Sequence, residues 1–403
     1  MRAIRNLTFA AYGMHLADQI ALVAVPLVAA LVFGASAQVI GLLVACQSMA
    51  HLLGSLPFGL IIDRAQARTV AIASTVISLA GFGGAALSIL GGSLVGFGAF
   101  VVVGGFGIVV FVLVSLSILP RLAQPSDLAR ANARLDLARA LCSFAVPLAI
   151  GLIITTRTAN WVFVVAAAGG LLALAAAIGL PRFPVSPPQP AGIFSLIREG
   201  GRFVLRHQLL LPIALCAVLW NLAFAALLAI MVPLAVDIYL AEPGVFGIAL
   251  SAFGLAATLG AFTVGRLSAV LPTSFFLLFG PGSSVAAILL LFAVAPGGSV
   301  LPVYAAFFIL GFGPSMWLTT QNSVRQLVTP AAMLGRVNAV IQTAIYGIRP
   351  VGALLGGFIA GTASPDAALV FVAAAYAGSF AVPLFSRLRT VRRFTDLTIM
   401  EAG

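Results

Sequence analysis

The sequence predicts an all-α integral membrane protein in which twelve transmembrane helices form two pseudo-symmetric six-helix bundles. Three observations support this fold class: an apolar composition, long apolar runs at regular spacing, and a one-sided distribution of arginines. Of the 403 residues, 62% are hydrophobic and 8% are charged, whereas a soluble domain carries about 25% charged residues. This composition excludes an ordinary soluble fold.

Clusters of charged residues, prolines and glycines divide the chain into twelve apolar spans, each about 20 residues or longer, enough to cross a bilayer. We expect the first span to be a retained helix, because its apolar run is longer than the core of a signal peptide. The predicted spans are 7–33, 36–61, 69–90, 94–119, 138–156, 160–180, 208–236, 245–265, 273–295, 299–322, 337–361 and 367–386.

The arginines predict the topology. The formal net charge is +11, and all 21 basic residues are arginine. If the spans alternate across the membrane, every arginine except Arg157 and Arg349 falls on one side. The positive-inside rule makes that side cytoplasmic and places both termini there. The excess of positive charge is therefore a topology signal, and we do not expect nucleic-acid binding.

An internal repeat predicts the two bundles. The hexapeptide L-A-R-A-N-A at 128–133 recurs as L-G-R-V-N-A at 334–339, and V-P-L at 25–27 recurs at 232–234. The matches keep their order at an offset of a little over 200 residues, which is typical of a duplicated unit.

The predicted domains follow from this repeat: an N-terminal bundle at 1–180, a cytoplasmic linker at 181–207, and a C-terminal bundle with its tail at 208–403. The linker opens with five prolines and continues as an Arg-rich amphipathic stretch from Ile193 to His207. We expect a stiff spacer followed by a helix in the inner membrane interface. A plain solvated linker is an equally good account of the proline-rich part.

One motif resembles a known family. The residues from Gly59 to Arg68 read G-L-I-I-D-R-A-Q-A-R, which is similar to the G-x-x-x-D-R-x-x-R signature of the major facilitator superfamily of secondary transporters. The L-x-R-x-N-A repeats and the run 197–207 resemble its drug-efflux branch, which includes siderophore exporters. The resemblance implies alternating access, a monomer, no cofactor, and export in exchange for protons. Two departures are that span 94–119 lacks a charged residue and that Val146 precedes Pro147 where the antiporter motif has glycine.

Two charged residues, Asp18 and Arg349, lie deep within predicted spans. Each is about 12 residues, or about 18 Å, from the cytoplasmic end of its helix, where an ionised side chain costs about 2.5–3.5 kcal/mol. His51 and Asn221 fall at similar depth. In the family that the chain resembles, these four spans border a central cavity. We therefore predict a substrate and coupling site formed by Asp18, His51, Asn221 and Arg349.

Asp18 is the predicted proton carrier, because desolvation favours the protonated carboxyl and a nearby arginine favours the carboxylate. His15, one turn away, is a candidate proton relay. A static ion pair between Asp18 and Arg349 is the alternative, as are ordinary interhelical hydrogen bonds for the histidines. Trp317 and Gln321 are candidate substrate contacts, or anchors at the membrane interface.

The cytoplasmic gate is predicted from the motif residues Gly59, Asp63, Arg64 and Arg68, which lie at the inner membrane surface. Charges there can bridge helix ends in one conformation and separate in another. The alternative is that they only set topology.

The sequence leaves alternatives to export open. An importer or uniporter of a small organic anion is the alternative within transport, and a membrane scaffold or receptor is another. A membrane enzyme is disfavoured, because no H-E-x-x-H, Walker or paired-carboxylate pattern is present. The three cysteines lie in apolar runs and predict neither a disulfide framework nor a metal site. The expected partners are a small-molecule substrate, protons and the lipid bilayer of a bacterial inner membrane.

Overall fold

Every regular secondary-structure element in the described part of the chain is a helix. The computed structural model describes residues 2–55, 66–122, 124, 127–182, 193–330, 333–394 and 397, which form thirteen α-helices, one π-helical segment and one 3₁₀ turn. Eleven of these helices are long and apolar enough to cross a membrane. The second predicted span begins in a further helix, α2 (Ala37–Ser55), and its last residues lie outside the described part. The protein is therefore a multi-pass membrane protein.

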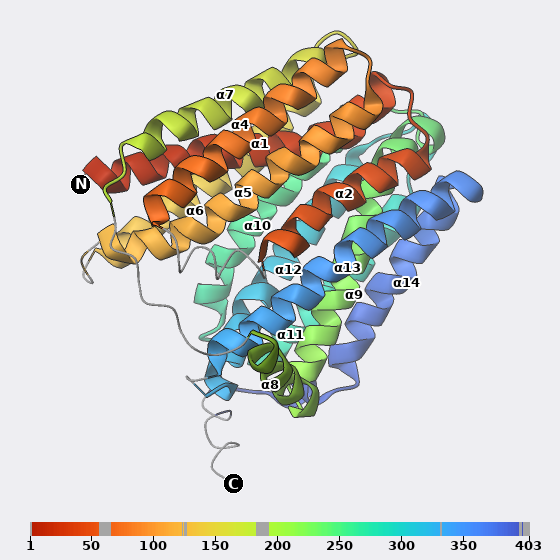
Figure 1. The fold of residues 1–403 in the computed structure, drawn as a ribbon. Helices are drawn as coiled ribbons and strands as arrows, with labels where there is room; N and C mark the ends of the chain where they lie inside the picture. Colours follow the sequence, from red (N-terminus) through yellow and green to blue (C-terminus); the bar gives the residue numbers. More distant parts are fainter. Residues whose placement is uncertain are drawn as a thin grey trace. The chain divides into compact units, whose positions relative to one another are not determined.

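Contacts divide the chain into two compact units. The first comprises Met1–Gln189 together with Glu242–Ser251, and the second comprises Pro190–Ala241 together with Ala252–Gly403. Besides α2, the first unit contains α1 (Arg2–Leu31), α4 (Ala67–Leu90), α5 (Leu94–Leu122), α6 (Leu128–Ile153) and α7 (Ala159–Ile178), coloured red to yellow-green in Figure 1.

The second unit contains the helices from α8 onward. Its boundary with the first unit falls within the predicted linker, except that the first residues of α10 are grouped with the first unit. The elements are α8 (Ile193–Arg206), α9 (Leu210–Pro233), η1 (Leu234–Ile238), α10 (Val245–Leu267), α11 (Thr273–Phe292), α12 (Leu301–Val328), α13 (Leu334–Thr362), α14 (Pro365–Leu384) and η2 (Arg387–Thr390).

Glycines allow helices of the first unit to meet backbone to backbone. A Cβ atom on Gly13 of α1 would overlap the carbonyl oxygen of Gly169 in α7, and one on Gly81 of α4 would overlap the backbone of Gly104 in α5. Helices in lipid associate through such close van der Waals contact, because the hydrophobic effect does not draw them together there. These glycines are therefore packing residues.

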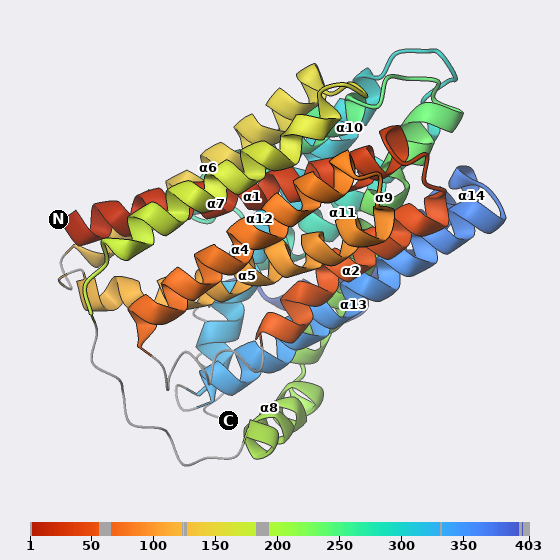
Figure 2. The ribbon, with the colours of Figure 1, turned by 45° about the horizontal axis from the view of Figure 1, so that its top comes forward.

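The second unit uses the same device between α9 and α13. Gly352 faces the carbonyl oxygen of Leu222, and Gly356, one turn later, faces the backbone of Ala226. Figure 2 shows these two helices among the blue and green elements of the second unit. These small residues on α13 therefore form a contact surface with α9.

The predicted start of one span is wrong by ten residues. The span 138–156 was expected, but α6 begins at Leu128, so the two L-x-R-x-N-A repeats form the first turns of α6 and α13 instead of loops. The physical reason is amphipathicity: Ala131 and Ala138 are buried at 3% and 0% exposure, while Arg130 and Arg134 are exposed. Arginines that face away from the bundle do not interrupt a helix.

The repeated V-P-L segments differ between the units. Pro26 lies within α1, whereas Pro233 ends α9 and is followed by the π-helical η1. Proline lacks the amide hydrogen that continues an α-helical ladder, and the wider π turn closes with Tyr239 N donating to Leu234 O at 2.9 Å. The duplicated sequence therefore folds differently at this point.

The replacement Gly13→Ala is expected to destabilise the first unit by about 1–3 kcal/mol, because the added methyl group must displace the α7 backbone. Gly83→Ala is the matched control, since a Cβ there meets nothing within 4 Å and alanine is the better helix former by up to about 1 kcal/mol. Thermal unfolding of the purified protein in detergent measures both. Equal melting temperatures for the two variants would contradict the packing assignment.

Candidate substrate and coupling site

The polar residues of the first unit begin on α1. Asp18 and His15 lie one turn apart and are half-buried, while their neighbours Met14, Ala17 and Ile20 are buried. The Nε2 atom of Gln19 donates to Asp18 Oδ2 at 3.4 Å. The helix thus buries an apolar stripe and leaves a polar stripe partly accessible. The carboxyl group of Asp18 lies on the accessible stripe, where it can exchange a proton with its surroundings.

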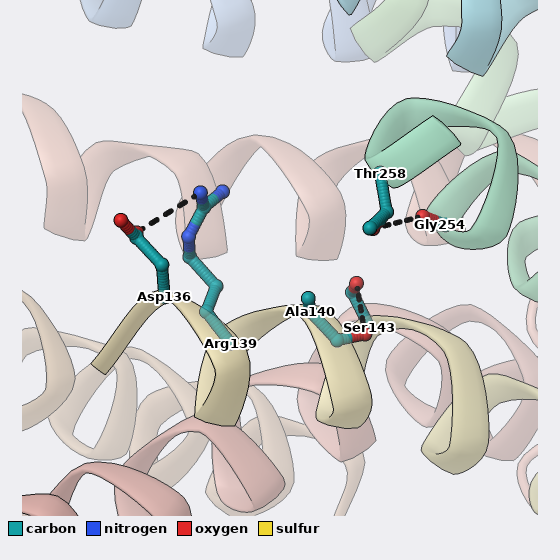
Figure 3. Close-up of polar contacts among 6 residues, drawn as sticks. All are labelled: Asp136, Arg139, Ala140, Ser143, Gly254 and Thr258. Carbon is teal, nitrogen blue, oxygen red and sulfur yellow. Dashed lines mark hydrogen bonds and ion pairs between the residues drawn. The ribbon is translucent and has the colours of Figure 1, made fainter. Parts of the chain in front are cut away.

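A second polar stripe lies on α6. Arg139 Nη2 and Asp136 Oδ1 are 3.4 Å apart, and their side chains are 66% and 70% exposed. Figure 3 shows this pair on one side of α6, with Ser143 one turn further along. A charge at the centre of a membrane-crossing helix costs about 2.5–3.5 kcal/mol against lipid, so the exposed Asp136–Arg139 pair is favoured where this face meets water or a ligand.

The two stripes lie on neighbouring turns. Cys142 Sγ donates to the carbonyl oxygen of Tyr12 at 3.9 Å, which places the adjoining turns of α6 and α1 side by side, with Arg139 one turn before Cys142 and His15 one turn after Tyr12. The first unit therefore carries a mixed cluster of an imidazole, a carboxyl and an ion pair. Such a cluster can bind a charged or hydrogen-bonding group and can move a proton.

Sequence reasoning missed Asp136 and Arg139. The predicted span began at 138, so Asp136 was placed in a loop and Arg139 was counted as a topology charge. The signal that would have found them is the helical spacing of polar residues at 132, 136, 139 and 143, which places them on one face of a helix.

Two predicted site residues of the second unit, Asn221 and Arg349, lie on α9 and α13, which pack against each other. Arg349 is half-buried on α13, three residues before the close contact of Gly352 with α9. Asn221 on α9 is also half-buried, and its Nδ2 donates to the carbonyl oxygen of Ala217 at 2.9 Å. Because Asp18 and Arg349 belong to different units, the ion pair between them stays a prediction.

Trp317 and Gln321 lie inside the helical bundle of the second unit, at 8% and 4% exposure. Trp317 packs within an apolar cluster. Gln321 Nε2 donates to Asn322 Oδ1 at 2.7 Å, and Arg325 Nη2 donates to the same oxygen at 2.8 Å. Arg325, which the sequence placed in a loop, is thus a buried cation at the end of α12, and substrate contact by Trp317 or Gln321 stays a prediction.

Only part of the predicted gate can be placed. Gly59, Asp63 and Arg64 lie outside the described residues, as does the side chain of His51 in α2. Arg68 Nη2 donates to the carbonyl oxygen of Ile178 at 2.7 Å, and Asn6 Nδ2 donates to that of Gly179 at 2.9 Å. A cation at a helix C-terminus is favoured by the helix dipole, so Arg68 holds the end of α7 within the first unit.

Within the ranges that the structure describes, eleven helices long and apolar enough to cross a membrane define a multi-pass membrane protein. The sequence profile of the Major Facilitator Superfamily matches residues 7–353. The chain belongs to this superfamily, which confirms the resemblance seen in its motifs.

Named relatives and solved structures agree with this assignment. The enterobactin exporter EntS of Escherichia coli O1:K1 / APEC is 32% identical over 246 residues, which cover 60% of this chain and 57% of the exporter. The EntS of Shigella boydii serotype 18 matches with the same identity and coverage. The alignment thus spans little more than half the length of these exporters.

Two solved structures share the fold. A POT family transporter in complex with 5-aminolevulinic acid has a TM-score of 0.78 at 14% identity, covering 96% of this chain and 97% of that one. The nucleoside transporter NupG has a TM-score of 0.78 at 11% identity, covering 95% and 99%.

The replacement Arg68→Gln is expected to lower the free energy of unfolding by about 1 kcal/mol, because it removes a charged donor from the end of α7. The exposed Arg157→Gln is the matched control, and thermal unfolding in detergent is the measurement. If Arg68→Gln impaired transport while its melting temperature matched that of the control, Arg68 would act as a gate instead of a structural contact.

Proposed function

We propose that this transporter exports an amphipathic small molecule of the siderophore or drug type, in exchange for protons and by alternating access. It works as a monomer in a bacterial inner membrane, with twelve spans and both termini in the cytoplasm. Membership of the superfamily and the similarity to enterobactin exporters support the class of activity. The one-sided arginines support the orientation.

The observation that carries the proposal is the polar cluster of the first unit. Asp18 lies one turn from His15 on α1, and the Asp136–Arg139 pair lies on α6, whose adjoining turn packs against α1. A proton on Asp18 and a substrate group at Arg139 would compete within this cluster. Competition of this kind is what couples substrate release to proton uptake in an exchanger.

The cluster also indicates a substrate class. Arg139 offers a planar guanidinium that can bind carboxylate or acidic hydroxyl groups through two hydrogen bonds, and Asp136 already holds it in an exposed position. An amphipathic substrate with an anionic group fits this chemistry, and the named relatives are enterobactin exporters.

An importer or uniporter of an organic anion is the second candidate, and Arg349 within α13 favours it. Inverted and right-side-out vesicles under an imposed pH gradient distinguish the two. Accumulation in inverted vesicles that are acidic inside supports export by proton exchange, whereas gradient-independent equilibration in both orientations supports a uniporter.

The replacement Asp18→Asn is expected to reduce uptake driven by the pH gradient into inverted vesicles by about tenfold or more, because an amide cannot carry the proton. Substrate binding, measured by quenching of tryptophan fluorescence, should remain detectable. The exposed Asp127→Asn, before α6, is the control and should transport normally. Unchanged gradient-driven uptake by Asp18→Asn would remove the carboxyl from the coupling mechanism.

The replacement Arg139→Gln is expected to raise KM about tenfold for an anionic substrate and to change KM little for a neutral dye, since one charged hydrogen bond is worth about 1.5–3 kcal/mol. Arg139→Lys should restore part of the affinity. Arg134→Gln, an exposed arginine nearer the start of α6, is the control. An equal rise in KM for both substrates would argue against a role in recognising charge.

A further inference from the structure

A helix outside the candidate site is tied firmly to the second unit. Helix α8 lies across the ends of α9 and α13 (Figures 1 and 2). Arg336 Nη1, in the first turn of α13, is 2.6 Å from Glu199 Oε2 on α8. Gly200 is buried beside this pair, and a Cβ atom there would lie 2.8 Å from the carbonyl oxygen of Arg336. The ion pair and the close backbone contact fix the position of α8.

Two adjoining pockets open along α8, with volumes of about 360 and 370 Å³. They share Arg206 and His207. The first pocket is also lined by Glu199, Arg202, Phe203 and Met333. The second is also lined by Gln208, Leu209, Val328, Arg387 and Leu397.

The charge of these pockets is strongly positive. Arg202, Arg206 and Arg387 contribute three guanidinium groups. Glu199 is the one acid among the lining residues that the structure describes, and it is engaged by Arg336. Among the described lining residues, guanidinium groups therefore outnumber carboxylates by three to one.

His207 occupies the backbone amides at the start of α9, which could otherwise bind an anion. Its Nδ1 accepts hydrogen bonds from the backbone amides of Leu209 and Leu210 at 3.1 and 3.3 Å. His207 thereby caps α9, and the proton of the neutral imidazole lies on Nε2. The first amides of α9 already have this acceptor, and the pockets offer an anion the guanidinium groups of their arginines.

Both pockets have apolar as well as charged lining residues, and exposed hydrophobic side chains lie close to lining residues in the chain. Leu205, next to Arg206, is 67% exposed, and Phe385, two residues before Arg387, is 81% exposed. The C-terminal segment holds Arg387 in place, because Leu388 is fully buried and Ser274 N and Thr273 N donate to the carbonyl oxygens of Val391 and Arg392 at 2.8 and 3.0 Å. Cations beside exposed apolar side chains are typical of a protein surface at the lipid headgroup level.

We propose that these two pockets bind the phosphate headgroup of an anionic phospholipid, with Arg206 as the shared contact and Arg202 and Arg387 at either side. Leu205 and Phe385 lie along the acyl chains. The bound lipid links α8, the start of α9 and the C-terminal segment, so it stabilises this end of the second unit. The lipid site shares no residue with the candidate substrate site. The lipid proposal therefore does not depend on which substrate is exported.

The test uses the full chain, purified in detergent and titrated with phosphatidylglycerol, cardiolipin or phosphatidylethanolamine, with bound lipid counted by native mass spectrometry. The double variant Arg206→Gln/Arg387→Gln should bind the two anionic lipids at least about tenfold more weakly, because each arginine near a headgroup contributes about 1 kcal/mol. The matched control Arg198→Gln/Arg389→Gln removes two exposed arginines from α8 and η2 that do not line the pockets. It should change the affinity less than about twofold, and phosphatidylethanolamine should not respond to either variant.

An inorganic phosphate arm separates a lipid site from a general anion site. Millimolar phosphate should displace the anionic lipids only weakly, because it lacks acyl chains to contact Leu205 and Phe385. Equal affinity for phosphate and phospholipid would overturn the lipid assignment, and equal losses in the double variant and its control would overturn the site. Circular dichroism of both variants verifies that they are folded.

Discussion

The absence of water in the hydrocarbon core is the constraint on which this structure depends. Backbone amides and carbonyls there must pair within their own segment, which makes each span a helix, and helices then attract one another mainly through close packing. Gly13 against Gly169 and Gly352 against Leu222 show the result, since the backbones touch where a side chain is missing. The positions of the functional side chains follow from which faces these contacts occupy.

The same constraint distinguishes polar residues that only pack from those that indicate a functional site. Hydroxyls satisfy themselves on their own helix, as Ser74 does by donating to Ala71 O at 2.8 Å and Thr343 by donating to Ala339 O at 2.7 Å. Charged groups cannot do this. Asp18, Asp136 and Arg139 therefore need water, a ligand or each other, and this need distinguishes them from the many polar residues that only pack.

The surface at α8 is not subject to this constraint. At the headgroup level its apolar side chains can contact lipid and its arginines can contact water or phosphate. The arginines that line its pockets come from α8 and η2, which are far apart in sequence. Their common location depends on the Glu199–Arg336 pair and on the docking of the C-terminal segment. A surface of this kind arises from packing between elements and has no sequence motif.

The sequence by itself determined the helical membrane class, most span boundaries to within a few residues, the superfamily, and Asp18 as an unusual charge. These depend on local hydrophobicity and short motifs, which need no knowledge of neighbours. The tertiary structure was needed to show that α6 extends back to Leu128, that Asp136 and Arg139 lie on turns of α6 near α1, that Arg68 binds the end of α7, and that Trp317 is buried. Each depends on which face of a helix meets another helix, and that is decided by packing between segments distant in the chain.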